Sequence, residues 1–219
     1  MSAAAEELKH MNKPRHFLTQ LDLTPLELRQ IINRATELKA MRDRGEDYRP
    51  FVGKNLAMIF EKSSTRTRVS FEAGMTQFGG NAMFLSPRDT QLGRGEPIED
   101  SARVISRMVD IVMIRTYSHD IVESFAKHSR VPVINGLDDV YHPCQVLADL
   151  QTVRENFGEL KGRRLVYVGD GNNMAHSLML GGALAGLSVR IISPAGWEPK
   201  QEHVDIAKET AKATGAEFD

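Results

Sequence analysis

Seven consecutive residues at positions 62–68 carry side chains well suited to hold an anion. They read KSSTRTR and follow the apolar run NLAMIF at residues 55–60, with Glu61 between the two. A helix that begins here offers free N–H groups and a positive dipole end, to which hydroxyls and a guanidinium add donors. Adjacent cations at such a helix end oppose the dipole unless an anion neutralises them. The segment therefore predicts an anion site, with a Ser/Thr N-cap beside solvated arginines as the alternative.

Other polar side chains follow later apolar runs. Arg115 directly follows the third run, and His142 with Gln145 comes after the fourth. Pro143 favours the first position of a helix, which puts His142 and Gln145 in its first turn. Because ligands of open α/β sheets bind at the carboxyl ends of the strands, we expect these groups and the KSSTRTR turn to share one crevice. For His142 alone, a locally packed or hydrogen-bonded histidine is the alternative.

The segment GDGNNMAHS at residues 169–177 has the look of a dinucleotide-binding fingerprint but matches it poorly. Met174 occupies the third glycine position, and the next strand ends at Ser193 without an acidic residue to hold a ribose. An NAD-dependent oxidoreductase is therefore the least favoured reading. We interpret Asn172 and Asn173 as amides for a polar small molecule, with a tight turn into a helix as the alternative.

Composition limits the class of protein. The chain has 219 residues, a formal net charge of −1 and a pI near 6.7, so it has no global field for nucleic acid or an anionic membrane. A single cysteine, Cys144, excludes an intramolecular disulfide and fits a reducing compartment. At a helix start it reads as a small residue in a tight turn rather than as a nucleophile. With neither a signal-like start nor a membrane-length apolar stretch, the expected location is cytoplasmic.

Short apolar runs alternate with helical patterns, which is typical of βαβ units in a parallel sheet. An opening helix is expected from Pro25, with Thr24 as its N-cap. A second strand–helix rhythm starts near residue 165 and has two strands, too few to bury both faces of a parallel sheet. We therefore expect an α/β fold of two doubly wound parallel-sheet domains, the second incomplete in this chain. The predicted strands cover residues 55–60, 81–85, 110–114, 131–134, 165–169 and 188–192.

Helical periodicity also assigns a buried face to three helices. The helix that begins at Pro143 is the expected bridge between the domains. The predicted buried positions are Leu28, Ile31, Ile32, Ala35 and Leu38 in the opening helix, Val69, Ala73 and Met75 after KSSTRTR, and Val146, Leu147, Leu150 and Val153 in the bridge.

Four segments in this order resemble the aspartate/ornithine carbamoyltransferase family: FEKSSTRTRVSFE, SRMVDIVMIRTY, YHPCQVLADLQT and VGDGNNMAHS. The STRTR and HPxQ elements are shared by all carbamoyltransferases and so indicate the family. Lys62, together with the LADLQT and DGNNMAHS segments, favours the ornithine-specific members. The resemblance covers nearly the whole chain.

The resemblance implies a carbamoyl-phosphate domain over about residues 1–150, a bridging helix over 143–157 and the first part of an ornithine domain over 158–219. It implies that His142 and Gln145 address the carbamoyl group, and that Arg66, Arg115 and His142 are catalytic. Asn173, together with Asn172, would meet the amino-acid end of ornithine. The residues implied for carbamoyl phosphate are Ser64, Thr65, Arg66, Thr67, Gln91, Arg115, His142 and Gln145.

The resemblance also implies carbamoyl transfer to L-ornithine in arginine biosynthesis, without a cofactor or a metal. The family forms trimers, and its loop matching residues 86–95 reaches a neighbouring subunit, so Gln91 is expected to serve an adjacent active site. The family's DxWxSMG and HCLP segments, which complete the ornithine side, do not occur in this sequence. Two alternatives stay open: a different amine such as putrescine, and a catalytically incomplete fragment that binds carbamoyl phosphate.

Overall fold

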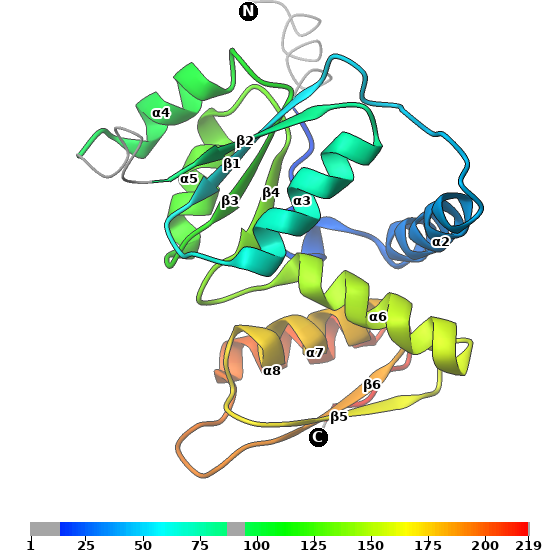
Figure 1. The fold of residues 1–219 in the computed structure, drawn as a ribbon. Coiled ribbons are helices and arrows are strands. Elements are labelled where there is room, and N and C mark those ends of the chain that lie inside the picture. Colours follow the sequence, from blue (N-terminus) through cyan, green and yellow to red (C-terminus); the bar gives the residue numbers. More distant parts are fainter. Residues whose placement is uncertain (1–13, 87–94, 219) are drawn as a thin grey trace, which may run out of the picture. The chain divides into compact units, whose positions relative to one another are not determined.

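The computed structural model describes residues 14–86 and 95–218, which form an α/β structure with parallel sheets (Figure 1). The predicted fold class is thereby confirmed. The chain divides into two compact units, and the division does not follow a single point in the sequence. Unit 1 contains the described residues up to Phe17, Arg49–Thr116 and Asp120–Ile134, and unit 2 contains Leu18–Tyr48, Tyr117–His119 and the described residues from Asn135 onward.

A four-stranded parallel sheet in the order β2-β1-β3-β4 forms the centre of the first half of the chain. Residues 56–59 of β1 align with residues of the strands on either side, so that Leu56 pairs with Ala82 and with Ile111. The central strands are almost fully buried because side chains cover both of their faces. The strands are β1 (Asn55–Phe60), β2 (Asn81–Leu85), β3 (Ile111–Arg115) and β4 (Val133–Leu137).

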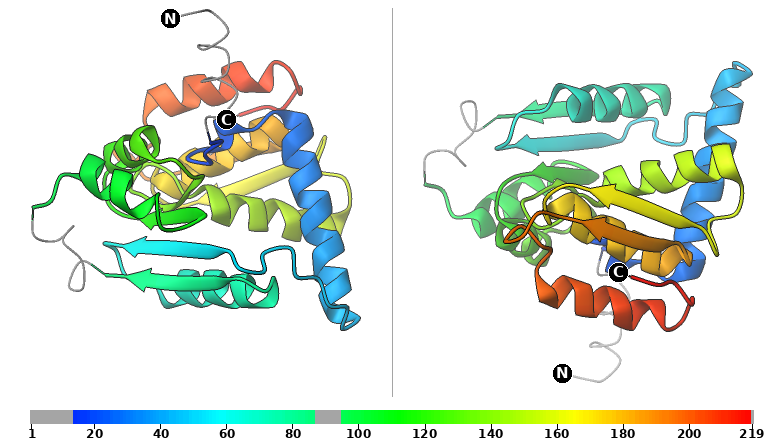
Figure 2. Two further views of the ribbon diagram at one scale, coloured as in Figure 1. Left: turned by 90° about the horizontal axis from the view of Figure 1, so that it is seen from above. Right: turned by 90° about the horizontal axis from the view of Figure 1, so that it is seen from below.

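Helices cover both faces of this sheet, as a doubly wound fold requires. In Figures 1 and 2, α3 lies on one face while α4 and α5 lie on the other. The face of α3 toward the sheet carries Phe71 and Met75, which pack with Met58 and Phe60 of β1. The helices are α3 (Thr65–Gln77), α4 (Ile98–Ile105) and α5 (His119–His128).

The predicted buried face of α3 is wrong in two of its three positions. Val69 is 57% exposed and Ala73 is also exposed, whereas Met75 is buried. The apolar pair four residues apart that packs against the sheet is Phe71 and Met75.

Unit 2 holds a two-stranded parallel sheet and most of the remaining helices. The opening helix begins as predicted, since the Thr24 side chain accepts from the Glu27 N–H and the Glu27 carboxylate accepts from the Thr24 N–H. Within the described ranges, no helix is both long enough and apolar enough to cross a membrane. The elements are a 3-10 turn (Gln20–Asp22), α2 (Pro25–Asp43), α6 (Pro143–Phe157), β5 (Arg164–Val168), α7 (Asn173–Ala185), β6 (Ser188–Ile192) and α8 (Gln201–Ala211).

Helices α7 and α8 cover one face of the β5–β6 sheet (Figures 1 and 2). On that face Val189 packs with Met179, Leu180 and Ala207. The opposite face of the same two strands is exposed at Val166, Val168 and Ile192. Helix α7 is buried along nearly its whole length, which explains its run of small and apolar residues.

The predicted buried stripes of the other two helices are confirmed at their central positions. The positions at the margins of each stripe are only half-buried or are exposed. Leu28 and Ile32 are buried in α2, whereas Ile31 is 38% exposed. In α6, Val146 and Leu150 are buried. The remaining predicted positions, Ala35, Leu38, Leu147 and Val153, are half-buried.

Candidate functional site

The KSSTRTR segment forms the end of β1 and the first turn of α3. Ser64 is the N-cap of α3: its Oγ accepts from the Thr67 N–H at 3.3 Å and donates to the Thr67 Oγ1 at 3.1 Å. Thr65 is the first residue of the helix and is exposed. The predicted N-cap and the predicted cluster of hydroxyls therefore coexist at one helix N-terminus.

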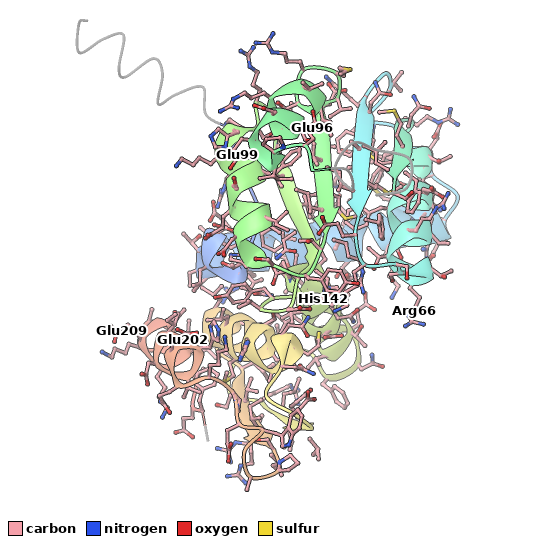
Figure 3. All side chains as sticks on the ribbon, turned by 90° about the vertical axis from the view of Figure 1, so that its left-hand side faces the viewer. Arg66, Glu96, Glu99, His142, Glu202 and Glu209 are labelled. Atoms are coloured by element: carbon pink, nitrogen blue, oxygen red, sulfur yellow. The ribbon has the colours of Figure 1, made fainter. Side chains whose placement is uncertain are left out.

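Two guanidinium groups border this turn. Arg115, half-buried at the end of β3, donates from Nε to the Lys62 carbonyl at 3.1 Å and from Nη1 to the Thr67 Oγ1 at 3.4 Å. Burial, and second the charge of Arg66, lower the pKa of Arg115. Arg66 itself is exposed and projects from the first turn of α3 (Figure 3). Like charges held this close to a positive helix end would be relieved by a bound anion.

The second arginine of the segment has a different environment. Arg68 donates from Nε to Glu72 at 3.0 Å, and its guanidinium lies 4.0 Å from the centroid of the Phe84 ring. Its charge is therefore compensated on the side of α3 next to β2, and Arg66 and Arg115 are the cations of the candidate anion site.

His142 and Gln145 lie at the start of α6, as predicted. His142, labelled in Figure 3, takes the N-cap position before Pro143. Its main-chain N–H donates to the Ser177 Oγ at 2.8 Å. Gln145 is exposed and donates from Nε2 to Asp149 at 2.9 Å. Burial raises the pKa of Asp149, and the bond from Gln145 acts in the opposite direction.

The two asparagines of GDGNNM differ in what they do. Asn172 caps α7: its Oδ1 accepts from the Met174 N–H at 2.9 Å and the Ala175 N–H at 3.4 Å, and its Nδ2 donates to Asp170. The alternative of a tight turn into a helix thus accounts for the Asn172 side chain. Asn173 donates from Nδ2 to the main-chain oxygen of Asp138 at 2.6 Å, which ties α7 to the loop before α6.

The glycine at position 171 has a structural explanation unrelated to a dinucleotide. A Cβ there would lie 2.1 Å from the Pro199 nitrogen, and the Gly171 N–H donates to the Trp197 carbonyl at 2.6 Å. The loop after β5 therefore needs a glycine because another backbone segment passes against it.

Cys144 is half-buried, and the surroundings of its thiol make it a poor nucleophile. Burial raises its pKa to about 12, and its Sγ donates to the Asn135 carbonyl at 3.5 Å. Cys144 is the second residue of α6 and does not lie in a tight turn, which corrects that part of the expectation. Over residues 14–86 and 95–218, no group of three His, Cys, Asp or Glu side chains is placed to hold a metal ion. Gln91 lies outside the described residues.

Comparison with known proteins decides the family. Residues 15–155 match the family described as "Aspartate/ornithine carbamoyltransferase, carbamoyl-P binding domain", and residues 161–219 match its "Asp/Orn binding domain". The chain belongs to the aspartate/ornithine carbamoyltransferase family. The resemblance predicted from the four sequence segments is thereby confirmed.

Curated relatives in this family are similar over most of the chain. An ornithine carbamoyltransferase of Acinetobacter baumannii is 64% identical over 188 residues, which are 86% of this chain and 61% of that protein. One of Halorhodospira halophila is 58% identical over 86% of this chain and 63% of its own length. The chain thus spans about three fifths of the length of the curated relatives it matches.

Solved structures in the family have the same fold. Ornithine carbamoyltransferase from Pyrococcus furiosus superimposes with a TM-score of 0.91 at 48% identity, covering 93% of this chain and 65% of that one. The enzyme from Burkholderia thailandensis gives a TM-score of 0.87, also at 48% identity, over 94% of this chain and 69% of that one.

Proposed function

We propose that this protein transfers the carbamoyl group from carbamoyl phosphate to the side-chain amine of L-ornithine, giving L-citrulline and phosphate for arginine biosynthesis. The observation that carries the proposal is the α3 N-terminus, where the capped turn at Ser64 meets the cations Arg66 and Arg115. Relatives named ornithine carbamoyltransferase, 58–64% identical, support ornithine as the acceptor.

The phosphate group would bind at the first turn of α3. Its oxygens would accept from the free N–H groups of the turn and the hydroxyls of Ser64, Thr65 and Thr67, while Arg66 and Arg115 would balance its charge. When the C–O bond to phosphate breaks, negative charge grows on the leaving group. Groups already fixed around it would stabilise that charge without reorganising.

The carbamoyl group would meet His142 and Gln145. The neutral amine of ornithine attacks the carbonyl carbon to give a tetrahedral intermediate with an oxyanion, which Arg66, Thr67 and His142 would stabilise. Collapse of the intermediate expels phosphate, and the amine loses a proton. This chemistry needs neither a cofactor nor a metal.

Asn173, with Asn172, would bind the amino-acid end of ornithine. A side-chain amide provides a donor for the α-carboxylate and an acceptor for the α-ammonium group. Of the two, Asn173 is the stronger candidate because the Asn172 oxygen already caps α7.

The two family matches, over residues 15–155 and 161–219, support a chain made of two functional domains. We propose a carbamoyl-phosphate domain over residues 1–150, with a bridging helix over 143–157, and the beginning of an ornithine domain over 158–219. A homotrimer in the cytoplasm, with Gln91 serving a neighbouring subunit, completes the proposal. Light scattering on the purified chain measures the number of copies.

Calorimetric titration with carbamoyl phosphate, followed by ornithine and a colorimetric citrulline assay on the same sample, tests the proposal. Binding together with citrulline supports the full reaction. Binding without citrulline supports the alternative of a fragment that holds carbamoyl phosphate, and absence of binding contradicts the site at α3. Replacing ornithine with putrescine in the same assay tests the other alternative.

A further inference from the structure

The carboxylate of Asp138, in the loop between β4 and α6, is fully buried and accepts four hydrogen bonds. Its Oδ1 accepts from the main-chain N–H groups of Val140 at 2.7 Å and Tyr141 at 2.6 Å. Its Oδ2 accepts from the His119 Nδ1 at 2.6 Å and the Asn135 Nδ2 at 2.7 Å. Such an arrangement compensates the cost of burying a charge, because hydrogen bonds satisfy both oxygens.

Two side chains donate to Asp138, those of His119 and Asn135, and each makes a further contact that holds it in place. In the bond to His119, the imidazole N–H on Nδ1 is the donor and the carboxylate oxygen is the acceptor. The ring of His119 also packs edge-on against Tyr141, with the ring centroids 4.9 Å apart. Asn135 donates from the same Nδ2 to the Leu18 carbonyl at 2.9 Å. An Asp that merely closes a turn needs only the two main-chain donors.

Asp138 also contacts the starts of α6 and α7, both in unit 2. In the proposed function, the first of these helices meets the carbamoyl group and the second meets ornithine. Toward α6, the main-chain N–H of Asp138 donates to the Tyr141 carbonyl at 2.9 Å, which fixes the residue before His142. Toward α7, the main-chain oxygen of Asp138 accepts from the Asn173 Nδ2 at 2.6 Å. The Ser177 Oγ of α7 in turn accepts from the His142 N–H.

We propose that Asp138 is a positioning residue that fixes His142 and Asn173 relative to each other for the transfer reaction. The inference rests on the proposed function for the roles of those two residues. It adds that a buried carboxylate, which touches neither substrate, holds them in one arrangement. When the carboxylate is lost, the turn at 138–141 loosens and both side chains lose their fixed position.

The test uses Asp138→Asn, which keeps the size of the side chain but replaces one acceptor with a donor. Asp139→Asn, an exposed neighbour with the same change of charge, is the matched control. In isotope-labelled protein we expect the Asn173 side-chain amide to exchange with solvent about tenfold faster in Asp138→Asn, and the His142 amide resonance to shift. Asp139→Asn should match the wild type in both measurements.

Calorimetry on the same samples measures whether the loss of fixed side-chain positions also weakens the binding of carbamoyl phosphate. We expect Asp138→Asn to raise the Kd for carbamoyl phosphate by about fivefold or more, and Asp139→Asn to leave it unchanged. If the wild-type chain binds no carbamoyl phosphate, the proposed function fails, while the resonance measurements still decide the role of Asp138. A folded Asp138→Asn variant with wild-type exchange at Asn173 and an unshifted His142 would overturn the inference.

A second variant tests the positioning role if Asp138→Asn does not fold. His119→Phe keeps the ring that packs on Tyr141 but removes the donor to Oδ2. We expect the same changes at Asn173 and His142 but of smaller size, because three of the four donors remain. Wild-type behaviour of His119→Phe in both measurements would then refute the positioning role.

Discussion

Arg66 and Arg68 differ by two positions in the sequence, yet the structure gives them different surroundings. Arg68 is compensated by Glu72 and by the Phe84 ring, whereas Arg66 is exposed and acts on the pKa of Arg115. The carboxylate that pairs with Arg68 makes it a poor partner for a phosphate. Anion affinity should therefore depend on the first arginine and not on the second.

Replacement of Arg66 by Ala is expected to raise the Kd for carbamoyl phosphate by about tenfold or more, since hydrogen bonds to charged groups are among the stronger ones. The affinity of the variant should also fall less steeply with added salt, because one cation fewer contributes. Calorimetric titrations at low and at physiological ionic strength measure both effects.

Arg68→Ala is the matched control on the same helix and should keep the wild-type Kd within about twofold. Equal losses of affinity in the two variants would mean that total charge, and not the geometry of the turn, governs binding.

His176 is a buried histidine whose neutral form the fold favours. Its Nδ1 lies 3.2 Å from the Val140 carbonyl and its Nε2 accepts from the Lys200 N–H at 3.4 Å, so one proton on Nδ1 satisfies both nitrogens. Burial first, and then the nearby His203, lower the pKa of His176 from 6.5 to about 4. Burial likewise lowers the pKa of His203, whose ring centroid is 4.0 Å away.

These shifts predict that the chain loses stability in mild acid. A folded-state pKa below the unfolded value means that the unfolded chain binds the proton more tightly, so stability is full above about pH 6.5 and falls as the pH drops toward 4. The His176 contribution amounts to about 3 kcal/mol over that window. Urea unfolding at a series of pH values, followed by circular dichroism, measures the slope.

The variant His176→Gln should have a shallower dependence of unfolding free energy on pH between 6.5 and 4 than the wild type. A slope in His176→Gln as steep as that of the wild type would assign the acid sensitivity to His203 or to carboxylates instead.

At the level of the elements, the strands could be predicted well from sequence because each is a short apolar run bounded by polar or glycine residues. The predicted ranges 55–60, 81–85 and 188–192 match β1, β2 and β6 without a shift. The face of α3 was predicted wrongly because Val69 is apolar but lies beside the polar residues of the first turn, where solvent reaches it. Apolar residues alone cannot show which side of a short helix meets the sheet.

Two glycines in helices differ in the space around them, and the sequence does not reveal this difference. A Cβ at Gly182 in α7 would lie 2.6 Å from the Val189 Cγ2 and 2.7 Å from the Leu187 carbonyl oxygen. A Cβ at Gly74 in α3 would have no atom within 4 Å. The first glycine permits close packing of α7 on β6, and the second has no such role.

Gly182→Ala should therefore lower the free energy of unfolding by about 1–3 kcal/mol, because a backbone atom would have to move to accept the methyl group. Gly74→Ala should raise it by up to about 1 kcal/mol, since alanine is the better helix former. Urea unfolding of both variants beside the wild type gives the two signs, and a stabilised Gly182→Ala would show that α7 can shift away from β6.

At the level of the whole chain, the candidate site could be predicted in its residue types but not in its supporting contacts. Ser64, His142 and Asn173 follow from motifs, since each stands at the start of a helix after a strand. Asp138 could not be predicted, because its role depends on donors such as His119, which lies 19 positions away. Long-range contacts of this kind leave no local pattern in one sequence.

The uncovered face of the β5–β6 sheet is the feature that should govern how whole molecules behave in solution. Val166 is 52% exposed, Val168 is 74% exposed and Ile192 is 49% exposed, and register pairing places Val168 beside Ile192. Adjacent apolar side chains on a flat strand face favour association between molecules. The chain should accordingly form particles larger than three copies as its concentration rises.

The double variant Val166→Thr/Val168→Thr should reduce the fraction of such particles while keeping the thermal midpoint, because threonine keeps the β-branched shape that suits a strand. Val69→Thr/Val104→Thr makes the same chemical change at two exposed helix positions, on α3 and α4, and should leave the fraction unchanged. Size-exclusion chromatography with light scattering over a range of concentrations measures it. Equal reduction by both double variants would mean that association follows total exposed apolar surface, whereas reduction by the strand variant alone would locate it on this sheet face.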